Sequence, residues 1–541
     1  MPWKIDNAEL KWVVIFSSVV ILITTVPYLI GFTQQAGYGD FTGFIFGIDD
    51  GNSYIAKMSS GTYGAWLFQT PYTTFPQKGI LAFLPYILLG KLASPANLHI
   101  QLVVLFHLFR IVAGFLSILA AYNFLSIFIT EISLRRFGLI LAVLGGGLGW
   151  LLILTGQTNW YGSLPLEFYS PESFGFLSLY GIPHLALSRA LLLWGFVLYL
   201  RPFPQSGESW KETKRGLSIG ALWLCMGFMQ PLYILIGWAV CLSHTAFCHA
   251  WQIVNRLKKA PANWAVCRQY LQRTAWAILI SSPLVVYSFI ASSADPFFEA
   301  WTKQNLILTP HPMHYLVAYG LMLIFSVWGA RKLVTLDRWM GWLPIIWIVI
   351  TPFLVYSPYN LQRRLAEGIW VALVVTVVAG LEAVPVRRRI AVHVPLLLLF
   401  PSTVMLLLGG INSALKPTLP YFRPEDEVAA FQYLSESCEF KSTVLSSYET
   451  GNALPAWAPV QVLIGHGPES IGIADLDNKV KQFYQPDTTD TERLELIDDY
   501  QIDYVFWGPA EKKLGNWDPG KETYLRPIFK KGEYTIFEPV D

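Results

Sequence analysis

Charged residues are scarce in this chain of 541 residues. Only 14% of them are Asp, Glu, Lys or Arg, whereas a soluble domain carries about 25%. Hydrophobic residues make up 53% of the sequence, so the composition excludes an ordinary soluble protein and indicates a membrane protein. The formal net charge is only +2. The chain therefore also lacks the concentrated basic face that a nucleic-acid partner would require.

Cysteine is rare as well. The five cysteines form neither a Cys-x-x-Cys pair nor a metal-ligand cluster. All except Cys438 fall in or beside apolar stretches, where cysteine usually behaves as a small hydrophobic residue. No disulfide framework is therefore predicted. The first apolar run also lacks a small-residue cleavage pattern, so we expect it to be a retained span and not a removed signal peptide.

Long hydrophobic runs, by contrast, are abundant. A membrane-spanning helix needs about 20 mostly apolar residues, and by that criterion the sequence contains about eleven candidates. They are residues 12–32, 104–130, 137–155, 182–200, 216–232, 233–250, 273–291, 312–330, 339–356, 366–384 and 390–410. Short basic segments separate alternate spans, at residues 135–136, 201–215, 256–259, 331–332 and 387–389. With the N-terminus in the cytoplasm, all of these segments are cytoplasmic, as the positive-inside rule requires. We therefore predict a multi-pass protein of the inner or plasma membrane.

In this topology residues 33–103 form a long extracytoplasmic loop. Its segment Gly79 to Ala93 is apolar but short, and Lys78 and Lys91 bracket it. Counting the segment as a span would place the later basic segments outside. We therefore predict that this loop contains interfacial helices, with residues 79–93 lying in the outer membrane interface. A short true span is the alternative.

The composition changes after residue 410. Residues 421–541 carry acidic and basic residues throughout, with a helical pattern at 425–434 and strand patterns at 443–445, 460–464 and 503–507. An odd number of spans places this part outside the cytoplasm. The predicted fold is mainly α: a polytopic helical membrane domain of residues 1–410, followed by a soluble extracytoplasmic α/β domain of residues 411–541, which is an ordinary domain size.

Two neighbouring carboxylates, Asp49 and Asp50, follow the first span. Asp and Gly together also make ordinary turns, but the position beside a membrane-embedded domain favours a catalytic site. Tyr54 lies four residues after Asp50, so the two side chains share a face if the segment is helical. Tyr54 would then help to shape a substrate pocket beside the carboxylate.

Polar residues inside or beside a span are costly in lipid and suggest function. On the predicted outer face these are Arg110, His184, Arg189, Gln230 and His311. Each has a structural alternative, such as pairing with a carboxylate or ending a helix. A divalent metal held by Asp49, Asp50, Glu167 and His184 is left open, because acid spacing alone does not demonstrate a site.

Gln362, Arg363 and Arg364 differ from these residues. Two adjacent arginines on the non-cytoplasmic side run against the positive-inside trend, so a compensating anion is expected. The forked, permanently charged guanidinium matches phosphate geometry. We predict a specific phosphate as the partner, with anionic lipid headgroups as the weaker alternative.

The order of these features resembles that of the GT-C glycosyltransferases of bacterial type, which use polyprenyl-phosphate sugars. The resemblance rests on a first span, an Asp followed four residues later by Tyr (Asp50 and Tyr54), an interfacial segment, and a span with Arg110 near its outer end. It covers residues 12–200 in layout. It implies an inverting hexosyl- or pentosyltransferase that moves sugar from a polyprenyl-phosphate donor to a glycan, lipid or protein acceptor, with Asp50 as general base.

Two departures from the family pattern concern the loop. Gly51 stands where the family often has Glu, so a second carboxylate is either Asp49 or absent, and the usual Pro-Pro pair before the interfacial segment is missing. A transporter or flippase of lipid-linked substrates is the competing class, and a membrane scaffold presenting residues 421–541 is a third. Polar residues gathered at one face favour the enzyme, since transporters often place ionisable residues at the midplane.

Overall fold

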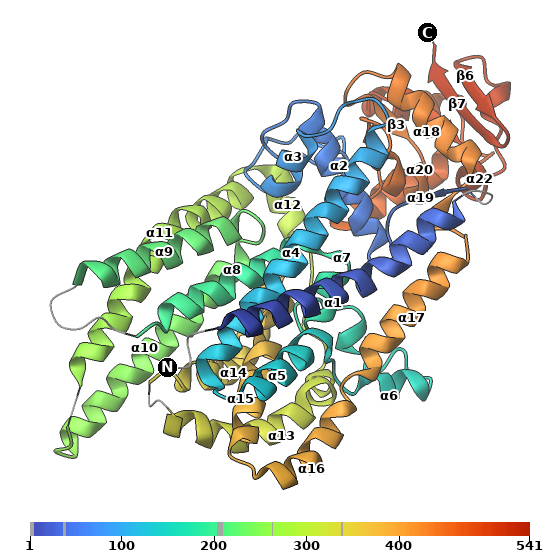
Figure 1. Ribbon diagram of the computed structural model, residues 1–541. Coiled ribbons are helices and arrows are strands. Elements are labelled where there is room, and N and C mark those ends of the chain that lie inside the picture. The colour runs from blue at the N-terminus through green and yellow to red at the C-terminus, as the bar shows by residue number, and fades with distance from the viewer. Residues whose placement is uncertain (1–4, 36–38, 203–208, 262, 337–338, 541) are drawn as a thin grey trace. The chain divides into compact units, whose positions relative to one another are not determined.

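The computed structural model describes residues 5–35, 39–202, 209–261, 263–336 and 339–540 (Figure 1). The chain divides into two compact units. Unit 1 comprises Met1–Thr25, Phe109–Phe289 and Leu306–Gly409; unit 2 comprises Val26–Leu108, Ile290–Asn305 and Gly410–Asp541. Helices α1, α4, α11 and α17 run from one unit into the other. Unit 2 therefore combines the loop after the first helix with the C-terminal part of the chain.

Helices make up unit 1 together with these connecting helices. Their bounds are α1 Asn7–Gln34, α4 Leu98–Phe128, α5 Ile132–Leu144, α6 Gly149–Leu154, α7 Phe176–Gly181, α8 Pro183–Tyr199, α9 Ser209–Gly227, α10 Leu232–Leu257, α11 Trp264–Ala294, α13 Pro312–Leu336, α14 Trp342–Val355, α15 Ile369–Glu382, α16 Val386–Leu397 and α17 Pro401–Leu415. Two 3-10 turns, η1 Leu166–Phe168 and η2 Gln362–Ala366, lie between helices.

Several helices have the length and composition of membrane spans. Within the described residues, seven helical segments are long and apolar enough: Asn7–Gln34, Leu98–Phe128, Leu232–Leu257, Trp264–Ala294, Pro312–Thr335, Gln362–Glu382 and Val386–Leu415. Helices α8 and α14 are shorter apolar helices. A helix suits such sequences because it satisfies every backbone N–H and C=O without water. The chain is a multi-pass membrane protein.

Two of the predicted spans are interrupted. Residues 137–155 fall on α5 and α6, which are separated by the glycine run that begins at Gly145. A side chain on Gly147 would approach the backbone of Ala318 to 2.6 Å, so close packing requires glycine there. Residues 390–410 fall on α16 and α17. The ring of Pro401 is incompatible with a helical carbonyl four residues earlier, at Leu397, where α16 ends.

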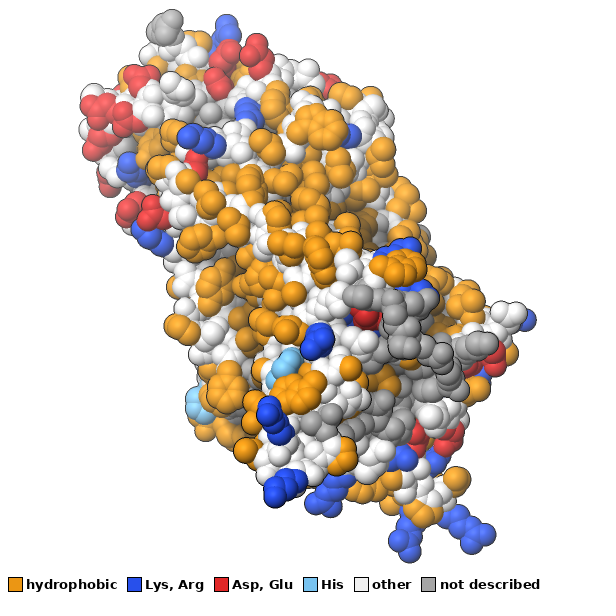
Figure 2. Space-filling model, turned by 90° about the vertical axis from the view of Figure 1, so that its left-hand side faces the viewer, with side chains coloured by type: hydrophobic (Ala, Val, Ile, Leu, Met, Phe, Trp, Pro, Cys, Tyr) orange, Lys and Arg blue, Asp and Glu red, His pale blue; other side chains and the backbone are white. Residues whose placement is uncertain are grey.

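Exposed hydrophobic side chains are widespread on the apolar helices. Leu22 of α1 is 61% exposed, Ile324 of α13 is 70% exposed and Phe353 of α14 is 76% exposed. Figure 2 shows one face of the molecule on which such side chains predominate. Exposed apolar surface of this extent is what lipid-facing helices require.

The segment Gly79 to Ala93 is not a membrane span. Only α3, Leu84–Gly90, is helical in it, and seven residues extend only about 10 Å of the roughly 30 Å that a bilayer core needs. The helix is therefore shorter than predicted. It packs closely on α2, Ile48–Thr62. A side chain on Gly90 would lie 1.7 Å from the carbonyl oxygen of Met58, so glycine is what permits this contact.

A five-stranded mixed sheet forms the centre of the C-terminal part. Its strands are β3 Thr443–Leu445, β4 Gln461–Val462, β5 Tyr504–Trp507, β6 Leu525–Lys531 and β7 Tyr534–Pro539, in the order β4-β3-β5-β7-β6. Strands β4, β3 and β5 are parallel, and β7 is antiparallel to β5 and β6. The predicted strands at 443–445 and 503–507 are confirmed, whereas only two residues of 460–464 form a strand.

Helices surround this sheet. They are α18 Glu425–Ser437, α19 Tyr448–Ala453, α20 Ile473–Phe483, α21 Asp490–Asp499 and α22 Pro509–Lys512, with 3-10 turns η3 Leu454–Ala456, η4 Gly467–Glu469 and η5 Pro519–Lys521. The central segment of unit 2 contributes α12 Pro296–Gln304, which contacts η4. The predicted helix at 425–434 is confirmed by α18. The core of this part includes buried Leu445, Val505 and Phe537 of the sheet.

The loop after α1 is built into the same unit as residues 410–541. Strand β1, Asp40–Phe41, pairs antiparallel with β2, Phe422–Arg423. The backbone N–H of Val462 donates to the carbonyl of Pro71 at 2.8 Å. Helix α2 also contacts α19 and η3, and Figure 1 shows α2 and α3 beside the elements of residues 410–541. Side chains of the loop and of the C-terminal part can therefore share one site.

Candidate functional site

Asp49 and Asp50 occupy the first turn of α2, where both are exposed. The chain enters this helix through Gly47, whose φ of 60° favours glycine. Carboxylates are stabilised at a helix N-terminus by its partial positive charge. Gly51 is required by packing, since a side chain there would meet the ring of Phe44 at 2.4 Å. This contact gives a physical reason why glycine follows Asp50.

Tyr54 lies one turn after Asp50 on α2 and is half-buried. Its ring stacks on that of Tyr86 in α3, with centroids 4.7 Å apart and an angle of 7° between the planes. The ring of Phe106 in α4 lies parallel at 6.1 Å. The predicted helical relation between Asp50 and Tyr54 is therefore present, and the tyrosine belongs to an aromatic stack that joins three helices.

His466, which sequence reasoning missed, faces Asp50. Its Nε2 lies 3.7 Å from Oδ1 of Asp50 and 3.9 Å from Oε1 of Glu469. Its side chain is 14% exposed, against 56% for that of Asp50. The imidazole ring also lies 5.4 Å from the ring of Tyr72. The available signal was weak: His466 is the only histidine after residue 393 and stands between two glycines.

A buried ion pair lies beside this contact. Nζ of Lys57 is 2.7 Å from Oε1 of Glu469, and the two side chains are 1% and 4% exposed. Ser53 and Thr70 also donate to the same carboxylate. Burial opposes the charge of Glu469, but Lys57 and the hydrogen bonds from Lys57 and Thr70 hold its pKa below the ordinary value. The carboxylate is therefore ionised at neutral pH and fully engaged.

Two buried amides connect the same elements. Nδ2 of Asn52 donates to Oδ1 of Asn452 at 2.8 Å. Nδ2 of Asn452 lies 3.4 Å from Nδ1 of His466. The hydroxyl of Tyr72 donates to the carbonyl of Asn452 at 3.1 Å. Helix α2 and the C-terminal part thus share a continuous polar network, which includes Asn52, Lys57, Asn452, His466 and Glu469.

Arg189 of unit 1 is buried and saturated. Its Nη2 donates to Oε2 of Glu367 at 3.1 Å, and its Nε donates to Oε1 of the same carboxylate. Further donations reach the carbonyls of Phe174 and Pro171, each at 2.9 Å. Arg110 is also buried and donates to Thr25 at 2.8 Å. These contacts favour a structural role for both arginines over substrate binding.

The remaining single polar residues lie in different surroundings. His184 is buried in the first turn of α8. Gln230 is buried between α9 and α10, and its backbone N–H donates to the carbonyl of Met226 at 2.9 Å. His311 is exposed just before α13 and stacks on Tyr161, with centroids 4.4 Å apart.

Gln362, Arg363 and Arg364 lie together in η2 and are half-buried. The amide of Gln362, oriented to satisfy both neighbours, hydrogen-bonds the backbones of Ser357 and Thr309. The guanidinium of Arg363 lies over the ring of Tyr169, 4.6 Å from its centroid.

Both arginines of this turn have unused hydrogen-bonding capacity. Nε of Arg364 lies 3.7 Å from Oε1 of Glu172, which is an ion-pair distance. Among the described residues, neither the Nε of Arg363 nor that of Arg364 has a hydrogen-bond partner. Both Nε atoms are buried donors, whereas the amide of Gln362 is satisfied.

Glu167, a residue considered for a metal, is buried in η1. Burial raises its pKa to about 7, although backbone N–H groups oppose this shift. One oxygen accepts from the N–H of Gly149 at 2.6 Å. Within the ranges that the structure describes, no three His, Cys, Asp or Glu side chains gather as a metal-holding group.

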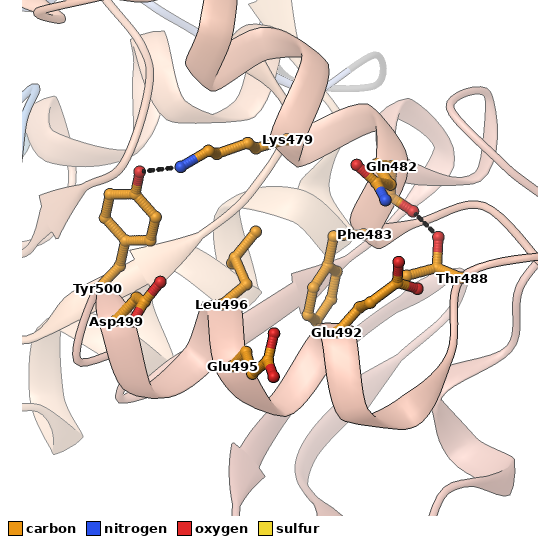
Figure 3. Close-up of a pocket in the computed structure, with 9 residues that line it drawn as sticks. All are labelled: Lys479, Gln482, Phe483, Thr488, Glu492, Glu495, Leu496, Asp499 and Tyr500. Carbon is orange, nitrogen blue, oxygen red and sulfur yellow. Dashed lines mark hydrogen bonds between the residues drawn. The ribbon is translucent and has the colours of Figure 1, made fainter.

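A separate pocket lies between α20 and α21 of the C-terminal part (Figure 3). Its lining residues are Lys479, Gln482, Phe483, Thr488, Glu492, Glu495, Leu496, Asp499 and Tyr500. Nζ of Lys479 donates to the hydroxyl of Tyr500 at 2.9 Å across one end of the pocket. None of the site residues predicted from the sequence lines it.

No family model and no curated protein matches this sequence. Solved structures of similar fold exist. ArnT from Cupriavidus metallidurans bound to undecaprenyl phosphate is 12% identical, with 98% of each chain covered and a TM-score of 0.51. The oligosaccharyltransferase AglB from Archaeoglobus fulgidus, in complex with an inhibitory peptide and a dolichol-phosphate, is 11% identical, with 93% of this chain and 70% of that chain covered and a TM-score of 0.52.

The arabinofuranosyltransferase AftD from Mycobacteria is also similar. It is 11% identical, with 98% of this chain and 40% of that chain covered and a TM-score of 0.58. Identities this low establish similarity of fold. The chain thus has the fold of the GT-C membrane glycosyltransferases, as the order of its sequence features predicted.

Proposed function

We propose that this protein is a membrane glycosyltransferase that moves a hexose or pentose from a polyprenyl phosphate to an acceptor outside the cytoplasm, with inversion at the sugar carbon. The observation that carries the proposal is the exposed Asp50 in the first turn of α2, within a GT-C fold. Two structures of similar fold contain a polyprenyl or dolichol phosphate, which supports a lipid-linked donor.

Asp50 is the general base in this mechanism. Its carboxylate takes the proton of the acceptor hydroxyl while the hydroxyl oxygen attacks the anomeric carbon from the side opposite the phosphate. The bond between that carbon and the phosphate oxygen breaks, and its electron pair leaves with the polyprenyl phosphate. The exposure of Asp50 supports this role, because a base must reach the substrate. Asp49, one residue earlier and also exposed, is the alternative base.

Arg363 and Arg364 bind the donor phosphate and stabilise it as it departs. Support comes from the Nε of each side chain, which has no hydrogen-bond partner among the described residues. The ring of Tyr169 holds the guanidinium of Arg363 by a cation–π contact, and Glu172 attracts that of Arg364. Hydrogen bonds from a guanidinium to phosphate are charge-assisted and about twice as strong as neutral ones.

The remaining predicted substrate residues keep subordinate roles in this proposal. Tyr54 borders the acceptor site, Gln362 fixes the turn that carries the arginines, and exposed His311 is available to a substrate. Arg110, His184, Arg189 and Gln230 are buried, and we assign them a supporting role within unit 1.

The topology follows from the same proposal. The N-terminus is cytoplasmic, and the membrane domain of residues 1–410 is followed by the extracytoplasmic domain of residues 411–541. Cys438 would report this poorly, because burial raises its pKa to about 11. A cysteine introduced at exposed Lys530 should react in intact cells with a membrane-impermeant thiol reagent. Labelling above the wild-type level only after permeabilisation would overturn this orientation.

Binding of undecaprenyl phosphate to the purified protein in nanodiscs tests the donor site. Arg363→Gln and Arg364→Gln should each weaken binding, because removing one partner of a buried charge-assisted contact costs about 2–5 kcal/mol. Arg387→Gln, at an exposed arginine of α16, is the matched control. Unchanged affinity in both variants would remove the phosphate role.

Turnover separates this proposal from a flippase or a scaffold. The wild-type protein, given radiolabelled polyprenyl-phosphate hexoses and pentoses, should release polyprenyl phosphate and labelled product. Movement of intact donor across the bilayer without cleavage would favour the flippase, and binding without either process would favour the scaffold.

A further inference from the structure

The orientation of His466 is set by a chain of buried amides. Nδ2 of Asn52 donates to Oδ1 of Asn452 at 2.8 Å, so the amide nitrogen of Asn452 must point the other way. That nitrogen lies 3.4 Å from Nδ1 of His466. Because an amide nitrogen only donates, Nδ1 is the acceptor, and the neutral imidazole carries its hydrogen on Nε2.

Nε2 points towards two carboxylates that differ in what they already bind. Glu469, at 3.9 Å, is occupied by Lys57, Ser53 and Thr70. Asp50, at 3.7 Å, is 56% exposed. The only hydrogen of the neutral imidazole nitrogens therefore faces the carboxylate that we assign as the base.

We propose that His466 is a positioning residue for Asp50, so that the C-terminal part of the chain completes the catalytic site. This inference rests on the proposed function. A hydrogen bond from Nε2 to one oxygen of Asp50 leaves the other oxygen free for the acceptor hydroxyl. The present 3.7 Å separation is longer than a hydrogen bond, and such contacts often tighten only when substrate binds.

The surroundings of His466 hold it for this task. The ring of Tyr72 packs on the imidazole at 5.4 Å, and the hydroxyl of Tyr448 accepts from the N–H of Gly467, the next residue. Lys57 and Glu469 form a sealed pair on one side. Asn52, two residues after Asp50, is fixed by the same network, so a shift of the C-terminal part would also move the helix turn that carries the base.

Steady-state sugar transfer by the full-length protein tests the inference. His466→Phe keeps a ring beside Tyr72 but removes the N–H donor, and kcat should fall about 10- to 100-fold with the donor KM unchanged, as for the loss of one hydrogen bond to a charged group. His466→Gln keeps a donor and should recover most of kcat. His393→Phe, on α16, is the matched control.

The outcomes separate two kinds of failure. Normal turnover in Asp50→Asn would overturn the base assignment of the proposed function itself. An inactive Asp50→Asn together with a normal kcat in His466→Phe would overturn only the positioning role, as would equal losses in the Phe and Gln variants. If His466→Phe does not fold, Asn452→Leu, which frees the imidazole tautomer, should lower kcat, and an unchanged kcat would contradict the inference.

Discussion

Unit 1 and unit 2 each contain a buried ion pair whose polar atoms are bound to protein partners, which we call a sealed pair. Each unit also contains a charged side chain that is exposed or has an unused hydrogen-bond donor, which we call an open group. In unit 1, Arg189 has donors bound to Glu367 and to backbone carbonyls, whereas the Nε of Arg363 has no hydrogen-bond partner among the described residues. In unit 2, Lys57 and Glu469 are almost entirely buried together, whereas Asp50 is exposed. Arginine side chains therefore occur in two different states in unit 1, as do carboxylates in unit 2.

The difference separates architecture from chemistry. A saturated buried pair has no capacity left for a ligand, and breaking it leaves an uncompensated buried charge. A group with an unused donor or an exposed carboxylate can bind substrate at little structural cost. On this basis we infer that the sealed pairs hold elements together, and we propose that Asp50, Arg363 and Arg364 meet the donor and acceptor.

The largest expected effect concerns the open carboxylate. Asp50→Asn keeps the size of the side chain and removes its basicity, so turnover should fall about 10²- to 10⁴-fold, while binding of undecaprenyl phosphate is retained. Radiolabelled sugar transfer measures the first quantity, and nanodisc binding measures the second. Near-normal turnover would mean that exposure does not identify the base.

Breaking a sealed pair should instead lower the stability of the fold. Lys57→Met leaves the buried carboxylate of Glu469 without its cation, which typically costs about 3–5 kcal/mol. The double variant Lys57→Met, Glu469→Leu should recover much of that loss, because apolar replacement of both partners is often neutral. Unfolding of the full-length protein in detergent measures both. Equal stability of Lys57→Met and wild type would remove the distinction between sealed and open groups.

The buried carboxylate of Glu427 allows a test by pH. Burial raises the pKa of Glu427 to about 7, although Arg423 opposes the shift. Since this pKa lies above the unfolded value of 4.5, the associated stability is complete below pH 4.5 and is lost as the pH rises towards 7. The free energy of unfolding therefore falls by at most about 1.4 kcal/mol per pH unit.

Glu427→Gln removes this titration. The melting temperature of the full-length variant should vary less than that of wild type between these pH values. An identical pH dependence in the two proteins would show that Glu427 does not titrate in this range.

The smallest effect is expected one residue before the base. Asp49 is exposed, and within the described part of the chain it is Asp50 that forms the ion-pair contact with His466. Asp49→Asn should change turnover by about twofold or less, the range of an ordinary surface substitution. If this variant is inactive while Asp50→Asn is active, the base assignment moves by one residue.

Much of the architecture could be predicted from local patterns. Apolar length identified the long apolar helices, and strand patterns identified β3 and β5, whereas β6 and β7 were not predicted. The interruption at Gly147 was not predicted, because it depends on the close approach of Ala318. Glycine alone does not disclose what packs against it.

The candidate site could be predicted only in part. Asp50 and the two arginines of η2 stood out by position along the chain. His466 did not, because its relation to Asp50 arises from packing: Lys57 and Glu469, which help to join the same elements, are 412 residues apart. Nor could Arg189 be distinguished from Arg363, since the partner of Arg189 is 178 residues away.

The most direct test of the account is a structure of the protein with undecaprenyl phosphate bound. We predict that a phosphate oxygen lies within hydrogen-bond distance of the Nε of Arg363 or Arg364, while Arg189 keeps its contacts with Glu367. A phosphate held by other residues, with both Nε atoms still unpartnered, would contradict the assignment of open charged groups to the donor.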